Sequence, residues 1–267
     1  MRSPDAALVP AAIRPLLIKE FRGVTTGRAL WTMLLILCPL IGYSFFQAVA
    51  LYGEASAAAR DAPALASGLS PLDGVLVPTF GAFYLAVTLL FPFVAIRAVG
   101  REKESGALRL LVQLPYGVPT LIGAKIAVVA TAWLIAFFPA ISALILWSAL
   151  GGHLYVLETG NLLLGHLLYG LLVAAIALAA ASVAESSATA AIITLAATIG
   201  SWVLDFALAG QPGILEWISH LSLTQTLRPF EQGLLPVGLV LGIGAGIAAL
   251  RRLPAYGFTP ASRPGGN

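Results

Sequence analysis

The chain has 267 residues, of which 59% are hydrophobic and only 10% are charged. A soluble domain of this length carries about 25% charged residues because its surface must face water, so this composition excludes one and predicts a single domain buried in lipid. The single cysteine, Cys38, excludes an internal disulfide and a cysteine-based metal cluster. The formal charge of +3 comes without a basic stripe interleaved with aromatic residues, so we do not expect nucleic acid as a partner.

The first predicted element is an amphipathic helix within the N-terminal tail, residues 1–28. Apolar residues recur there at helical spacing, and basic residues flank them, which is typical of a helix that lies flat on the cytoplasmic leaflet. The alternative, that the stretch merely anchors the first span, stays open. The apolar residues are Ile13, Leu16, Leu17, Phe21 and Val24, and the basic ones are Arg14, Lys19 and Arg22.

Six apolar runs predict six transmembrane helices, since a span needs roughly 20 mostly apolar residues. The runs are continuous and do not alternate, which favours helices over a β-barrel. The first is too long for a secretory signal and contains Pro39, so we expect it to be retained. The spans cover residues 29–51, 77–99, 122–150, 162–183, 188–208 and 234–250, which places a transmembrane domain at 29–250 and a C-terminal tail at 251–267.

Lysine and arginine residues predict the orientation of these spans. Thirteen of the 15 fall before the first span, around the connection between spans two and three, or after span six. Only Arg60 and Arg228 fall on the opposite face. Because positively charged loops stay in the cytoplasm, both termini are expected on the cytoplasmic side of the membrane.

Two further segments have a predicted place in this topology. The outer connection 209–233 is too long for a turn and too apolar for a free loop, so we expect it to lie at, or dip into, the outer interface, with Trp217 at that level. The glycines Gly238, Gly242 and Gly246 recur every fourth residue in the last span. Such spacing lets helices approach closely, either within the chain or between two copies.

The connection between spans two and three combines charge with an apolar face. Mixed charges at Arg101, Glu102, Lys103 and Glu104 precede Gly106, and the apolar face that follows includes Ala107, Leu108 and Leu111. This pattern predicts a short cytoplasmic helix whose charged start contacts a partner protein. The alternative is a solvated loop that obeys the positive-inside rule.

Several stretches resemble the type-2 ABC exporter permeases, in order and over nearly the whole chain. The branch with the most similar pattern includes permeases of gliding-motility and nitrous-oxide-reductase maturation systems. The stretches are Lys19-Glu20-Phe21 before the first span, Arg101-Glu102-x-Glu104-x-Gly106-x-Leu108, Leu114-Pro115, Gly123-Ala124-Lys125, and the region from Ile218-Ser219-His220 to Phe230-Glu231-Gln232-Gly233.

This resemblance implies a permease pair, formed with a second copy or a paralogue, above two cytoplasmic ABC ATPase subunits. Residues 1–28 would contain an elbow helix, and the stretch around 101–108 would be the coupling helix. We expect no enzyme activity and no cofactor in this chain, with ATP and Mg²⁺ on the ATPase, and a periplasmic or membrane accessory protein as a further partner. Residues 117–126 imitate a phosphate-binding loop, but their glycine spacing is wrong and Ala124 separates Gly123 from Lys125.

An ion-coupled secondary transporter is the alternative function. It would need titratable groups near mid-membrane, where they are costly and therefore usually functional. The only candidates near apolar depth are Asp205, His166, Glu185 and Lys125, and each falls within about two turns of a predicted span end, where snorkelling is possible. The scarcity of charge favours an apolar substrate, such as a lipid or a hydrophobic peptide, over a free ion.

Overall fold

The computed structural model describes residues 8–61, 68–104, 118–208 and 222–250, and this part of the chain contains helices and no strand. Five helices are long and apolar enough to cross a bilayer, which confirms an all-helical, multi-pass architecture. These are α2 (Arg28–Asp61), α4 (Val77–Glu104), which the π-helix η2 (Leu72–Leu76) precedes, α6 (Val118–Ala149), α7 (Val156–Val183) and α8 (Ser187–Leu208). The shorter helices are α1 (Leu8–Thr25), α10 (Arg228–Glu231) and α11 (Val237–Leu250).

The predicted sixth span corresponds to α11, which has 14 residues. A helix of this length covers about 21 Å, whereas the hydrocarbon layer is about 30 Å thick. The residues after Leu250 lie outside the described part of the chain, so the sixth span stays a prediction. A Cβ added at Gly238 or Gly242 would meet no atom within 4 Å, so these two glycines do not pack closely against the described residues.

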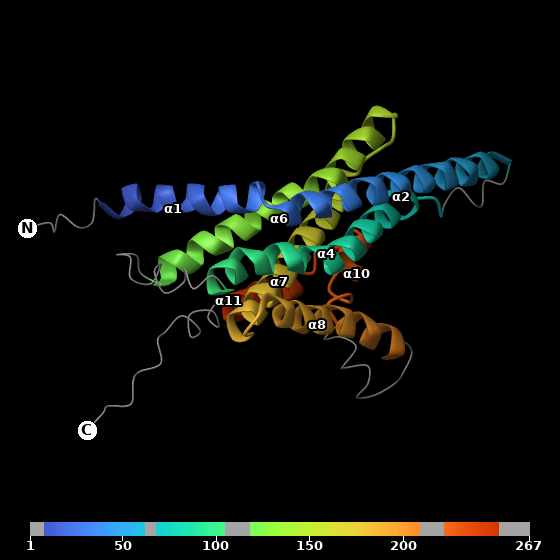
Figure 1. Ribbon diagram of the computed structural model, residues 1–267. Helices are drawn as coiled ribbons and strands as arrows, with labels where there is room; N and C mark the ends of the chain where they lie inside the picture. The colour runs from blue at the N-terminus through green and yellow to red at the C-terminus, as the bar shows by residue number, and fades with distance from the viewer. Residues whose placement is uncertain (1–7, 62–67, 105–117, 209–221, 251–267) are drawn as a thin grey trace, which may run out of the picture.

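Helices α4 and α7 form the centre of the bundle, with α2 and α8 on opposite sides of it (Figure 1). Buried residues make up 61% of the most apolar window of α4 and 67% of that of α7, but only 22% in α2 and α8. The outward face of α2 exposes large apolar side chains, among them Trp31, Leu35 and Phe46. Such a surface requires lipid or another membrane-embedded chain around it.

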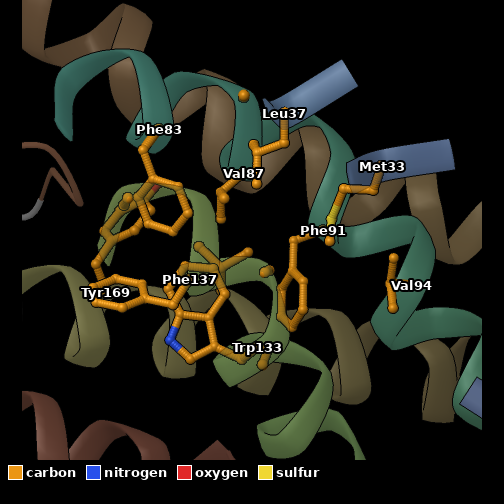
Figure 2. Close-up of a cluster of buried hydrophobic side chains, with 14 of the residues drawn as sticks. Met33, Leu37, Phe83, Val87, Phe91, Val94, Trp133, Phe137 and Tyr169 are labelled. Carbon is orange, nitrogen blue, oxygen red and sulfur yellow. The ribbon is translucent and has the colours of Figure 1, made fainter. Parts of the chain in front are cut away.

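The core between α2, α4, α6 and α7 is aromatic (Figure 2). Phe83, Phe91 and Phe137 surround the indole of Trp133, with ring centroids 5.0–5.8 Å from it. In lipid the hydrophobic effect does not drive helices together, so close fit has to supply the attraction. Gly170 of α7 allows this close fit because it has no side chain. A Cβ at this position would lie only 2.0 Å from Cζ2 of Trp133 and would clash with the ring.

Candidate functional site

The N-terminal amphipathic helix forms as α1, directly before the first span. Leu16 and Glu20, one turn apart, are buried against the start of α6, where Ala124 and Lys125 are also buried. Of the predicted apolar face, Leu16 is buried in the protein, whereas Phe21 is 43% exposed. The exposed side of α1 carries apolar and charged residues together, and its position on the cytoplasmic leaflet stays a prediction.

Glu20 and Lys125, two of the candidate residues, form a buried ion pair between α1 and α6. Lys125 Nζ lies 3.4 Å from Glu20 Oε2, and the two side chains are only 5% and 8% exposed. Lys19 Nζ lies 3.7 Å from the other oxygen, Glu20 Oε1, but this lysine is 57% exposed. A buried pair holds its geometry because losing either partner would leave an uncompensated charge in a medium of low polarity.

The predicted coupling segment lies between the end of α4 and the start of α6, the helix that carries Lys125. Arg101, Glu102, Lys103 and Glu104 are the last residues of α4, with their backbone in the helix. Gly106 and Leu108 lie outside the described residues. Helix α6 resumes at Val118, and Lys125 follows two turns later, about 10 Å along the axis. Residues 118–126 are therefore helical and do not form a phosphate-binding loop.

The remaining titratable candidates do not gather into a site. Asp205 lies in the last turn of α8, and its side chain is outside the described part. Glu185 is exposed in the turn between α7 and α8. His166 is buried, and its Nδ1 lies 2.9 Å from the carbonyl oxygen of Leu162. Among the side chains that the structure describes, Glu20 is the only buried carboxylate, and it is paired with Lys125.

A second polar region, at the opposite ends of the spans, involves residues 222–233. Leu223 N donates to Ser201 Oγ of α8 (2.6 Å), the Tyr84 hydroxyl of α4 lies 3.2 Å from Thr224 Oγ1, and Asn161 Nδ2 of α7 donates to Gly233 O (2.6 Å). Within this segment only Arg228–Glu231 is helical, as the single turn α10. Residues 209–221 lie outside the described part, so the position of the outer connection at the interface stays a prediction. Trp217 lies outside the described part.

Phe230 fixes this segment to the bundle. Its side chain is fully buried, and a Cβ added at Gly165 of α7 would lie 2.5 Å from Phe230 Cβ. Sequence reasoning missed this contact, because nothing in the spacing of either residue points to a partner 65 positions away. A glycine inside an otherwise continuous apolar span was the only available signal that something large packs there.

The described part of the chain therefore defines a multi-pass helical membrane protein whose N-terminal helix is bound to its third span by a buried ion pair. A family model described as ABC-2 family transporter protein matches residues 14–233. The match covers most of the chain and includes both Glu20 and Lys125, so the chain belongs to the ABC-2 transporter family. A search of curated proteins finds no match.

Proposed function

We propose that the chain is the permease subunit of an ABC exporter in a bacterial cytoplasmic membrane, with both termini in the cytoplasm. The family match over residues 14–233 carries this proposal. Two permease subunits, identical or paralogous, would form the pathway, and two ABC ATPase subunits would bind and hydrolyse ATP with Mg²⁺ below them. The chain would have no enzyme activity of its own. Membership of the gliding-motility or nitrous-oxide-reductase branch stays a prediction.

The segment between α4 and α6 is the proposed contact with the ATPase. Glu102 and Glu104 would accept charge-assisted hydrogen bonds in a groove of the ATPase, each worth about 1–3 kcal/mol where water is excluded. Helix α4 is continuous from Val77 to Glu104 and α6 from Val118 to Ala149. A displacement of the intervening segment would therefore tilt two long helices, and α4 is central to the bundle.

The test begins with purification of the chain from native membranes under gentle conditions. The expected complex contains two permease chains and two ABC ATPase chains, measured by intact mass. A stable monomer that transports without any ATPase would refute the proposal. An assembly around a different kind of protein would refute it equally.

The double variant Glu102→Gln/Glu104→Gln then tests the contact, since it keeps side-chain size and removes both charges. Loss of as little as about 1.4 kcal/mol would weaken ATPase binding tenfold. The matched control is Glu54→Gln, which removes an exposed carboxylate near the C-terminal end of α2, away from the proposed contact. If the double variant binds the ATPase and supports hydrolysis like the parent, these carboxylates are ordinary loop charges.

A further inference from the structure

We propose that the Glu20–Lys125 ion pair transmits movement from the start of α6 to α1 and onward to α2. This inference rests on the proposed function, because it assigns the pair a role in coupling to the ATPase. Lys125 and Glu20 would be positioning residues that keep α1 attached to α6 while the coupling segment moves. The pair would provide a second route into the membrane domain, in addition to the direct connections through α4 and α6.

The first step of this route is the contact between α6 and α1. Apart from the ion pair, the small buried cluster at this contact comprises Leu16 and Ala124 among the side chains that the structure describes, with Leu17 partly buried beside them. Contact between a leucine and an alanine sets the separation of α1 and α6 but hardly their register along each other, because dispersion is not directional. The Lys125 Nζ to Glu20 Oε2 contact at 3.4 Å, in contrast, holds one atom of each helix in register.

The second step is the joint between α1 and α2, which consists of Thr26 and Gly27. Trp31 of α2 donates its indole N–H to Thr25 O across this joint, at 2.6 Å. Thr26 N and Thr26 Oγ1 both donate to Arg22 O, at 2.9 and 2.6 Å. The three bonds satisfy carbonyl groups that a helix end normally leaves open, and the one from Trp31 ties the end of α1 to the first turn of α2.

The geometry of Gly27 makes the joint tight. A Cβ at this position would lie 2.9 Å from Gly23 O and 3.0 Å from Val24 O, both backbone atoms that cannot move aside cheaply. The joint is thus short, hydrogen-bonded and closely packed. A displacement of α1 would consequently reach α2 as a change of its angle, because little freedom remains at the joint to absorb the displacement.

A paired neutral variant separates this role from a role in stability. Glu20→Gln/Lys125→Met removes both charges, and such replacements of buried pairs often leave stability unchanged because no lone charge remains. The reversed pair Glu20→Lys/Lys125→Glu restores the contact with opposite polarity. Arg22→Gln is the matched control, since it removes an exposed charge from the same helix.

The readout is a spin label at Ile18→Cys, an exposed position on α1, in a Cys38→Ala background and in the purified complex with its ATPase. Addition of ATP and vanadate should change the distance between the labels of the two permease subunits in the parent and in Arg22→Gln. The change should be lost in the paired neutral variant and return in the reversed pair.

Three results would overturn the inference. The first is a distance change in the paired neutral variant that equals that of the parent, and the second is no distance change in the parent complex. The third is loss of the ATPase from a neutral variant whose melting temperature equals that of the parent, since the pair would then serve to bind the ATPase. The proposed function fails differently: in that case the parent binds no ABC ATPase, and the labels are never measured in such a complex.

Discussion

Replacing Gly170 by alanine should destabilise the helix bundle, although alanine is the better helix former. The new Cβ would lie 2.0 Å from Cζ2 and 2.1 Å from Cε2 of Trp133, a ring that is 1% exposed and packed on three sides by phenylalanine rings. Forcing an extra carbon into a filled core costs about 1–3 kcal/mol. The helix itself gains about 0.5–1 kcal/mol from the same change. The difference of these two effects runs from about 0 to 2.5 kcal/mol, so the expected net loss is about 1 kcal/mol.

Gly160 provides the control for this measurement, because it lies on the same helix and a Cβ there would meet nothing within 4 Å. Gly160→Ala should therefore show only the stabilisation that alanine gives to a helix. The difference in the free energy of unfolding between the two variants then isolates the steric cost at Gly170. Unfolding in mixed micelles with increasing SDS, followed by helical circular dichroism, gives both free energies. In a Trp133→Phe background, which removes the atoms nearest to Gly170, the gap should shrink. Equal unfolding midpoints for Gly170→Ala and Gly160→Ala would refute the packing argument.

Two further predictions concern the ends of the spans. Burial raises the pKa of Glu231 above its ordinary value of 4.5, against an opposing effect of Arg228, so the folded state holds this proton more tightly than the unfolded state and stability should fall as pH rises above 4.5. Glu231→Gln should lose that slope in SDS unfolding curves, and an identical pH dependence in both proteins would contradict the assignment. In a Cys38→Ala background, Ala57→Cys should react with an impermeant thiol reagent added outside, whereas Glu185→Cys should react only after permeabilisation. The reverse labelling pattern would overturn the orientation.

The first five spans could be predicted from the sequence because each one is a continuous apolar run, and such a run is stable in a bilayer as a helix. Helix ends were harder to predict, since hydropathy does not determine where a helix stops. Helix α2 continues to Asp61, ten residues beyond the predicted end at 51, because the following stretch is rich in alanine and forms a helix without being apolar. Helix α4 likewise includes the charged residues up to Glu104, which favour helix in water.

Contacts between distant residues could not be predicted from a single sequence. Glu20 and Lys125 were each candidates on grounds of resemblance, but 105 positions separate them and neither pattern names the other as its partner. The same holds for Trp133 with Gly170, where a bulky residue and a glycine on different spans fit together. Residue type indicates that a partner is needed, and only the folded arrangement of the helices determines which one it is.

The length of α2 has a mechanical consequence. Its 34 residues extend for about 51 Å, well beyond the roughly 30 Å of hydrocarbon, and its last turns carry exposed polar residues such as Glu54 and Arg60. Because its joint with α1 is tight, α2 would tilt together with α1, and a tilt of only about 5° over this length moves the far tip by about 4 Å. On the proposed route, the far end of α2 is therefore the part of this helix that a small displacement of α1 would move furthest.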